Sequence, residues 1–499
     1  MLNKKRLISS SLVVLMACTI LPSTSAFACT TVLVGKNATA DGSTIIARSE
    51  DADTANPKRV VVHPATTNPA GTIFSSKANG FKMELPSDAK KYTATPEYTD
   101  EYGLFEESGT NTSGVGMSAT ESTQYNDKVK KLDPLDEKNG IGEEAMLTVV
   151  LPYVKSAKEA VTYLGDIVTK YGAAECNGIA FSDVNDVWWF EIVSGHHWIA
   201  QRIPDGKYAV VANQMSNADI DLSKKDKFMA DEGLSEFIED NKLAKSGTKF
   251  NLRDVFSTND KEDAKYNICR VWDGQRLLTE SVEDKYSITS KKIPFLQKAD
   301  DKIEVSDVRD IFRSHFNGTD YDPYTKAKGS YRPIMVQRNV ETHIIQWRPD
   351  MPVAISGIQW EALGSSEHSI FVPLYSGITD VSDQFKNEAS LTPTYDNAYW
   401  IFKTTDVLST PYYKTYMKKY VNPTFEKIEK KLDKNVEASD KAALEMYKAN
   451  PDDQAGLEQY LTEETKKNSE YTFNQVVKLN NKMFIKSTNA RNSIHNSNL

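Results

Sequence analysis

Short apolar and β-branched segments, separated by polar turn residues, characterise the first half of the chain and predict strands. Residues 29–35 and 44–48 are two such segments, and the Asp-Gly dipeptide at 41–42 between them is a strong turn signal. The two segments therefore predict a hairpin that places Cys29 opposite residues near position 50.

Helical periodicity alternates with these strands. Gly142–Leu151 and Ala157–Tyr171 are amphipathic, and the second places five apolar residues on one face: Ala160, Val161, Leu164, Ile167 and Val168. Further strands are expected at Val187–Val193 and Tyr208–Ala212. Strands that alternate with paired helices predict an α+β fold in α/β/β/α layers.

The final part of the chain has a different pattern. Apolar residues recur at helical spacing in Asn422–Leu432, Asp440–Tyr447 and Phe473–Ile485. The polar stretch Thr488–Leu499 is expected to be disordered. We therefore predict a helical C-terminal extension with a disordered tail over residues 401–499.

The N-terminus has the pattern of a secretory signal. A basic segment at Lys4–Arg6 precedes the apolar stretch Leu7–Leu21, and the Ala-Phe-Ala sequence at 26–28 supplies small residues for cleavage before Cys29. A lipoprotein-type cut before Cys18 is the alternative. We predict that residues 1–28 are a signal peptide and that the protein is secreted to the extracellular space.

The composition and net charge of the chain limit the kinds of partner that it can bind. Apolar residues make up 39% of the chain, charged residues 26%, and the mean hydropathy is −0.50. Beyond the N-terminus, no apolar run approaches the ~20 residues of a membrane span. The formal charge of −9 becomes −12 when the leader, with its three basic residues, is removed. We expect a soluble protein with no membrane span and no nucleic-acid partner, because an acidic surface repels phosphates.

Cleavage before Cys29 would leave three cysteines: Cys29, Cys176 and Cys269. A disulfide between the last two would leave Cys29 free, and the sequence leaves this pairing open. An N-terminal cysteine combines a thiol nucleophile with an α-amino group, of pKa near ~7.7–8.0, that can serve as its base. In the predicted hairpin, Arg48 would lower the pKa of the thiol, and Asp51 would hold the arginine and the ammonium group.

Motifs in a characteristic order extend along residues 29–400. They are Cys29-Thr-Thr-Val-Leu-Val-Gly, Asp41-Gly-Ser-Thr, Ala47-Arg-Ser-Glu-Asp-Ala-Asp53, Gly114-Val-Gly-Met-Ser-Ala-Thr-Glu121, Trp189-Phe-Glu-Ile-Val-Ser-Gly-His-His-Trp198, Tyr208-Ala-Val-Val-Ala-Asn-Gln214, Tyr266-Asn-Ile-Cys-Arg-Val-Trp272 and Gln346-Trp-Arg-Pro349. Together they resemble the dipeptidase A family of N-terminal-nucleophile cysteine hydrolases, which is similar to penicillin V acylase and bile salt hydrolase. The resemblance implies a catalytic αββα sandwich over residues 29–400.

The resemblance also implies roles for single residues. Cys29 would be nucleophile and base, and Arg48 and Asp51 match the Arg-x-x-Asp pair of the family. Asn213 matches an asparagine that helps to form the oxyanion hole in the related acylases. A second acylase asparagine is absent here, where the chain has Glu121, and we expect this carboxylate to bind the ammonium group of a dipeptide.

Arg270 matches an arginine that lies near the thiol in the acylases, and we expect it to contribute to substrate binding. Metal binding is not expected, because Glu191, His196 and His197 lack the spacing of a metal motif and the two histidines would point to opposite faces of a strand. No cofactor motif is present either.

Three functions remain open at this level. A secreted cysteine dipeptidase, acting on dipeptide substrates, is favoured. The alternatives are a hydrolase of N-acyl amides such as penicillin V or conjugated bile salts, and a non-enzymatic surface binding protein. A homo-oligomer is compatible with the sequence.

Overall fold

The structure, a computed structural model, describes residues 29–52, 55–258, 260 and 263–496. One sheet has seven strands: β1 (Thr30–Val34), β2 (Thr44–Asp51), β14 (Tyr208–Ala212), β18 (Leu296–Gln297), β19 (Asn339–Trp347), β20 (Gly357–Leu363) and β21 (Val372–Tyr375). A second has six: β9 (Ser108–Thr110), β10 (Gly116–Ser122), β11 (Asn177–Ser182), β12 (Val187–Ile192), β13 (Trp198–Arg202) and β16 (Phe228–Ala230). The strand orders are β18-β14-β1-β2-β19-β20-β21 and β16-β13-β12-β11-β10-β9, and all pairings within them are antiparallel.

The longer helices are α2 (Glu143–Val150), α3 (Ala157–Tyr171), α6 (Cys269–Leu278), α8 (Val305–Phe312), α11 (Ala398–Ser409), α13 (Asn422–Ala449) and α14 (Gln454–Asn496). Shorter helices are α1 (Asp127–Leu132), α4 (Leu234–Asp240), α5 (Leu252–Phe256), α7 (Ser281–Lys285), α9 (Val353–Ser356), α10 (Asp383–Lys386) and α12 (Tyr413–Tyr416). Two-stranded ribbons are formed by β3 (Val61–His63) with β8 (Tyr92–Ala94), β4 (Thr66–Thr67) with β7 (Asp88–Ala89), β5 (Ile73–Ser75) with β6 (Lys82–Glu84), and β15 (Asp219–Asp221) with β17 (Lys249–Asn251).

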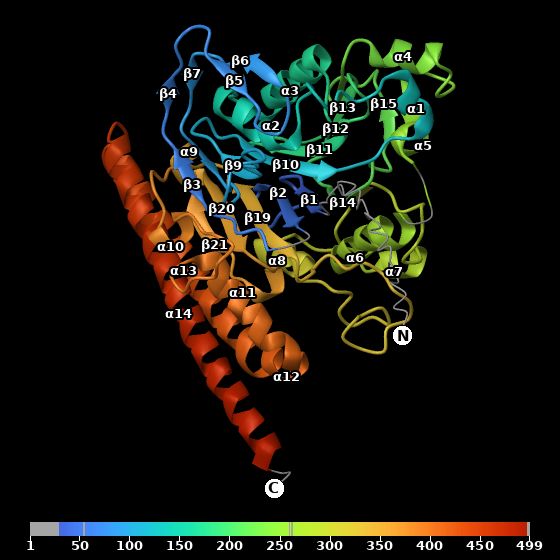
Figure 1. Cartoon of the computed structure of the whole chain (residues 1–499). Coiled ribbons are helices and arrows are strands. Elements are labelled where there is room, and N and C mark those ends of the chain that lie inside the picture. Colours follow the sequence, from blue (N-terminus) through green and yellow to red (C-terminus); the bar gives the residue numbers. More distant parts are fainter. Residues whose placement is uncertain (1–28, 53–54, 259, 261–262, 497–499) are drawn as a thin grey trace, which may run out of the picture.

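The two large sheets face each other, and helices cover their outer sides (Figure 1). Helices α2 and α3 share a core with β10 to β13. Helices α8, α11, α13 and α14 share another core with the seven-stranded sheet. The predicted mixture of helix and sheet is confirmed, and the side chains between the sheets are shielded from solvent on both sides.

The N-terminal hairpin has the predicted register. Thr31 pairs with Arg48 and Thr30 with Ser49, so the same register continued by one residue places Cys29 opposite Glu50. Gly42 takes a left-handed conformation, with φ of 78°, in the connection between the strands, which glycine adopts without steric cost. Because side chains alternate along a strand, Arg48 faces the second sheet while Ala47 packs toward the helices.

The C-terminal helices differ from the prediction in extent. The segments expected at 422–432 and 440–447 belong to one helix, α13, and α14 continues to Asn496. The expected disorder over the described part of 488–499 is therefore wrong. A helix that is anchored by packing, as Leu479 and Met483 anchor α14, extends at little further cost into a polar sequence.

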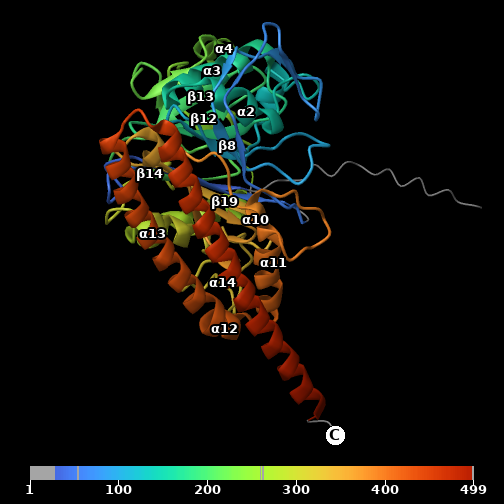
Figure 2. The ribbon, with the colours of Figure 1, turned by 90° about the vertical axis from the view of Figure 1, so that its left-hand side faces the viewer.

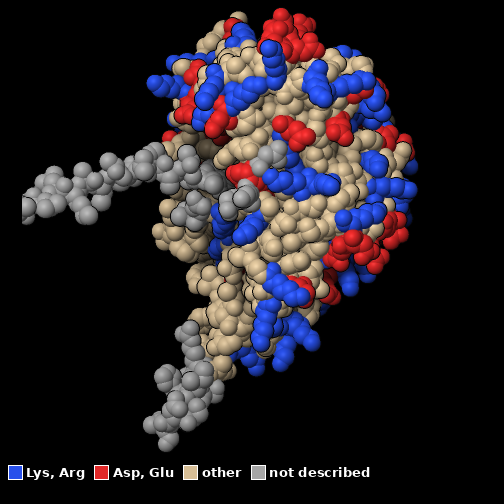
Figure 3. Space-filling model, turned by 90° about the vertical axis from the view of Figure 1, so that its right-hand side faces the viewer, with Lys and Arg blue, Asp and Glu red and all other residues tan. Residues whose placement is uncertain are grey.

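Helices α13 and α14 pack side by side over the seven-stranded sheet, and the C-terminal end of α14 projects beyond the rest of the ribbon (Figures 1 and 2). Within the described residues, no helix is both long and apolar enough to span a membrane. On the face in Figure 3, basic and acidic side chains are interspersed. The signal peptide expected over residues 1–28 lies outside the described residues.

The three cysteines that the structure describes are unpaired and buried. Cys176 packs in the core between the sheets, whereas Cys269 packs in a separate cluster around α6. The pairing of Cys176 with Cys269 that the sequence left open is therefore absent.

Candidate active site

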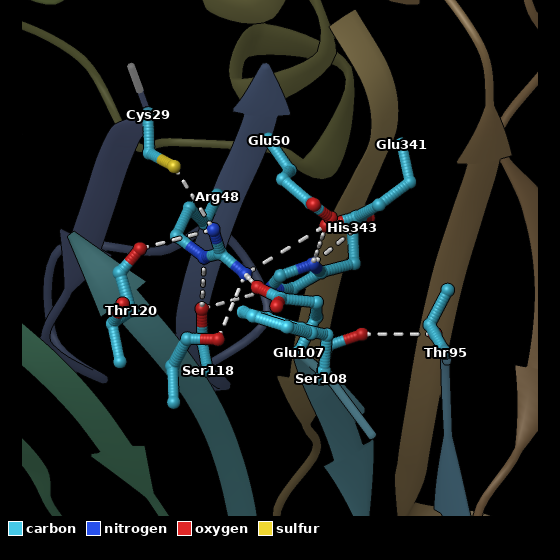
Figure 4. A network of polar contacts seen from close by, with 12 residues as sticks. Cys29, Arg48, Glu50, Thr95, Glu107, Ser108, Ser118, Thr120, Glu341 and His343 are labelled. Atoms are coloured by element: carbon cyan, nitrogen blue, oxygen red, sulfur yellow. Dashed lines mark hydrogen bonds and ion pairs between the residues drawn. The ribbon is translucent and has the colours of Figure 1, made fainter. Parts of the chain in front are cut away.

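Cys29 lies immediately before β1, fully buried, and faces the guanidinium group of Arg48 on the neighbouring strand. The Nη1 group of Arg48 donates to the Cys29 sulfur at 3.1 Å (Figure 4). The antiparallel pairing of β1 with β2 produces this contact, as the sequence predicted. The arrangement brings a fixed positive charge to a thiol in a water-excluded environment.

The remaining hydrogen-bond donors of Arg48 are directed at the second sheet. They reach Glu107, the carbonyl oxygens of Ala119 (2.9 Å) and Thr120 (3.0 Å), and the hydroxyl of Ser118 (3.3 Å). Strand β10 has a bulge at this point, between Ala119 and Glu121, where one residue of β11 faces two of β10. The carbonyl groups of two successive residues thereby accept from one guanidinium.

Burial dominates the acidity of Cys29. Burial raises the pKa of the thiol well above its usual range; Arg48 opposes this shift, and three carboxylates, Glu121, Glu143 and Glu50, reinforce it. The expected lowering by Arg48 is therefore present but outweighed. The resting side chain is a neutral thiol, so a base must remove its proton before it can attack a substrate.

Arg270 and Asn213 meet on the other side of Cys29. Arg270, on α6, is fully buried and donates to the Cys29 carbonyl, to Thr30 Oγ1 (3.0 Å) and to Asn213 Oδ1 (2.7 Å). Asn213 follows β14, whose Ala212 pairs with Thr30, which explains its position beside Cys29. Arginine is only a donor, so this contact orients the Asn213 amide with its oxygen toward Arg270. Arg270 therefore organises the residues around the nucleophile.

Asp51 holds an arginine, but not the predicted one. Its carboxylate accepts from Arg332 and from the Asn339 side chain, and lies 3.8 Å from Arg338. The carboxylate against Arg48 is instead Glu107, with Glu341 at 3.9 Å. Side chains alternate between the faces of β2, so Arg48 and Asp51, three residues apart, lie on opposite faces and cannot pair.

Glu121 is buried between the sheets, close to the nucleophile. Its Oε2 accepts from Thr31 Oγ1 at 2.8 Å, and its Oε1 has no hydrogen-bond partner among the described residues. Burial raises the pKa of Glu121 to about 7, although Arg270, Thr31 and Arg48 act in the opposite direction. A buried carboxylate oxygen without a partner is a costly feature that a cationic ligand would relieve.

Several charged residues of the site have no signal in the sequence. Glu107 has a left-handed backbone, with φ of 52°, which is uncommon for a residue other than glycine. Its carboxylate lies between Arg48 and the buried amine of Lys58, which is 4.0 Å from Oε1. Lys58 also pairs with Glu50 at 2.9 Å, and this neighbourhood of carboxylates raises the pKa of its amine against the effect of burial. These residues come from distant loops and strands, so no local pattern indicates them.

The three residues considered as metal ligands each bind a different partner. His196 pairs with Asp133 at 2.9 Å, His197 with Asp231 at 2.8 Å, and Glu191 accepts from the backbone and hydroxyl of Ser216. Within the described part of the chain, no group of three or more His, Cys, Asp or Glu side chains is arranged to hold a metal ion.

Comparisons with known proteins show which proteins this chain resembles. Residues 28–426 match peptidase family C69. The chain is 43% identical over 391 residues to the "Probable dipeptidase" of Latilactobacillus sakei, covering 77% of this chain and 82% of that protein. It is 37% identical over 441 residues to the "Probable dipeptidase B" of Lactococcus lactis subsp. lactis, covering 85% and 91%. A solved structure, of the Caenorhabditis elegans N-acylethanolamine-hydrolyzing acid amidase ortholog, aligns with a TM-score of 0.27 at 13% identity, covering 65% of this chain and 94% of that one.

The family match and the two dipeptidase relatives define the class of this protein. It is a hydrolase of peptide bonds, of the cysteine-peptidase type. The chain belongs to peptidase family C69, the dipeptidase A family, as its motifs indicated.

Proposed function

We propose that the protein is a secreted cysteine dipeptidase in which the mature chain begins at Cys29. The observation that carries this proposal is the buried Arg48–Cys29 contact at 3.1 Å, at the start of β1 in a chain of family C69. Two facing sheets between helical layers are compatible with an N-terminal-nucleophile αββα sandwich, which we take as the fold class. The printed names of the relatives, dipeptidases, favour a dipeptide over an N-acyl amide as substrate.

The first step is attack by the thiol on the carbonyl carbon of the dipeptide. After cleavage of the leader, the α-amino group of Cys29 is the nearest base and accepts the thiol proton. The thiolate forms a bond to carbon, and the carbonyl electrons move to oxygen. Arg48 stabilises the thiolate, whose burial otherwise opposes ionisation.

The tetrahedral intermediate then collapses. The Asn213 amide, oriented by Arg270, is placed to donate to the oxyanion, a contact typically worth ~2.7–4 kcal/mol of the barrier. The α-ammonium group returns its proton to the departing amine, which leaves as the C-terminal amino acid. Water, activated by the same amine, hydrolyses the thioester and releases the N-terminal amino acid.

Glu121 and Asp51 complete the proposed site. The unpartnered Oε1 of Glu121 would accept the ammonium group of the substrate. Asp51, one position beyond the residue opposite Cys29, would hold Arg332 and the new ammonium group of Cys29.

Replacement of the nucleophile tests the proposal directly. Cys29→Ala is expected to abolish dipeptide hydrolysis and leave the thermal unfolding midpoint nearly unchanged. Cys176→Ala is the matched control, because this buried thiol lies in the core between the sheets. Turnover by Cys29→Ala at the wild-type rate would exclude the proposed mechanism.

The role of the amine is tested by one additional residue. A chain that retains Ala28 has an amide in place of the basic amine, and we expect it to be inactive toward dipeptides although the thiol is intact. Removal of that residue by an aminopeptidase should restore activity. Intact-mass analysis of the protein secreted by its native host identifies the N-terminal residue. If the chain began at Cys18, the proposed mechanism would require a second cleavage before Cys29.

A further inference from the structure

A chain of polar side chains extends from Arg48 through the space between the two sheets (Figure 4). The Nε group of Arg48 donates to Ser118 Oγ at 3.3 Å, and the same oxygen lies 2.8 Å from His343 Nε2. The Nδ1 atom of His343 lies 3.1 Å from each carboxylate oxygen of Glu341. All four side chains are buried, and the strands that carry them, β2, β10 and β19, come from both sheets.

The directions of these hydrogen bonds follow from the chemistry of the groups. Arg48 Nε can only donate, so Ser118 Oγ accepts from it. The other hydrogen-bond neighbour of that hydroxyl among the described residues is His343 Nε2, so the Ser118 hydrogen is donated there. A neutral His343 ring that accepts through Nε2 carries its hydrogen on Nδ1 and donates it to Glu341. In this tautomer, the Nε group of Arg48, the Ser118 hydroxyl and the Nδ1 group of His343 each donate to the next group in the chain.

The order Glu341–His343–Ser118 is that of an acid–histidine–serine catalytic chain, but its surroundings exclude that role. Ser118 Oγ accepts from Arg48 Nε, and the guanidinium of Arg48 separates it from the Cys29 sulfur, to which the same group donates. The chain therefore acts on Arg48. It fixes the rotation of the guanidinium plane, because Nε is the donor nearest the stem of the side chain.

The position of Arg48 determines how strongly it stabilises the Cys29 thiolate, and nearby carboxylates also attract its guanidinium group. Glu107, next to β9 of the second sheet, and Glu341, on the neighbouring strand β19, attract the guanidinium, whereas Cys29 needs it at the end of β1. Glu50, on β2, and Glu121 and Glu143, on β10 and α2, also act on the thiol, and each disfavours its ionisation. A small displacement of Arg48 would weaken the attraction that opposes these carboxylates at the thiol.

We propose that Ser118 and His343, supported by Glu341, are positioning residues that hold the Arg48 guanidinium against the Cys29 sulfur and thereby set the acidity of the nucleophile. The consequence for catalysis rests on the proposed function, but the effect on the thiol does not. Neither residue contacts the sulfur, so each acts through Arg48.

The test is a titration of the Cys29 thiolate by its ultraviolet absorbance, as the difference between each variant and the same variant with Cys29→Ser. In Ser118→Ala we expect the thiol pKa to rise by about one unit, which is about tenfold less thiolate at a given pH. Ser108→Ala is the matched control. It removes a buried hydroxyl between the same sheets, bound to Thr95 (3.1 Å) and Gln359 (3.0 Å), and should leave the titration unchanged.

A second pair of variants keeps the test decisive if Ser118→Ala does not fold. His343→Leu should raise the thiol pKa, and His343→Gln, which restores an acceptor for the Ser118 hydroxyl, should return it toward the wild-type value. His368→Leu is the control, because this buried histidine lies against Ser365 at 3.2 Å, outside the site. Coinciding titrations of the Ser118 or His343 variants and their controls would overturn the proposal.

Kinetics separate this inference from the proposed function. If the protein is a dipeptidase, Ser118→Ala should lower kcat and leave KM nearly unchanged, because Ser118 does not touch the substrate. A shifted thiol titration in a protein that hydrolyses no dipeptide would retain the positioning role and reject the proposed substrate.

Discussion

At the scale of single residues, the site combines a buried thiol with several buried charged side chains. Burial raises the pKa values of Cys29 and Glu121, and in both cases Arg48 acts in the opposite direction. The same cation therefore favours the ionised form of the nucleophile and of the carboxylate assigned to the substrate ammonium.

Glu121→Gln tests that assignment. We expect KM for dipeptides to rise roughly 10- to 100-fold, since a buried charge-assisted hydrogen bond is lost, with a smaller effect on N-acyl amides that carry no ammonium group. Because the pKa of Glu121 is about 7, wild-type kcat/KM should fall as the pH drops below 7, where the carboxylate becomes protonated. In the Gln variant the contribution of Glu121 to that acidic limb should be missing, and only protonation of the Cys29 amine should remain.

Glu191→Gln is the matched control for this measurement. Glu191 is also buried with a pKa of about 7, but its oxygens accept from Ser216 and not from a site residue. An unchanged KM in Glu121→Gln would favour an acylase-like pocket without an ammonium receptor.

At the scale of elements, local sequence signals and packing agree best in α3. The Ser156 side chain caps its first turn by accepting from the Glu159 amide, and Gly172, with φ of 74°, ends it. The prediction of Ala157–Tyr171 is therefore confirmed at both ends. Helix α14 lacks such an end signal within 488–496, and its length follows from its contacts with α11, α13 and β21.

Substitutions along α14 measure how much its packing contributes. Leu461 is fully buried in the core below the seven-stranded sheet, and Leu461→Ala is expected to cost about 2–5 kcal/mol of unfolding free energy. Phe484, on the same helix, is 62% exposed, and Phe484→Ala should change stability by less than about 0.5 kcal/mol. Thermal unfolding of both variants compares them. Equal losses would show that α14 does not pack as described.

At the scale of the whole molecule, the fold buries several carboxyl groups. Burial raises the pKa values of Glu50, Glu143 and Glu361, so these groups resist ionisation in the folded protein. Their folded pKa values exceed the unfolded ones. Each therefore contributes stability that is fully present below the unfolded pKa and is lost as the pH rises through the folded value.

Glu191 offers a measurement of this effect outside the site. Its pKa rises to about 7 through burial, against an unfolded value of ~4.3, so ionisation costs roughly 3–4 kcal/mol of stability between pH 4 and pH 7. We expect Glu191→Gln to flatten the decline of the unfolding midpoint over that range, measured at one scan rate. The predicted direction would be contradicted if the unfolding midpoint of the wild-type protein rose from pH 5 to pH 7 by the same amount as that of Glu191→Gln.

The sequence by itself determined the hairpin and the Cys29–Arg48 contact, because pairing across a short turn and alternation along a strand are local rules. It also indicated the family, through motifs in order. Only the tertiary structure decided that Glu107, and not Asp51, faces Arg48, and that Ser118 and His343 stand behind it. Those contacts join residues 59 to 225 positions apart across two packed sheets, and such non-local packing has no periodic signature in a single sequence.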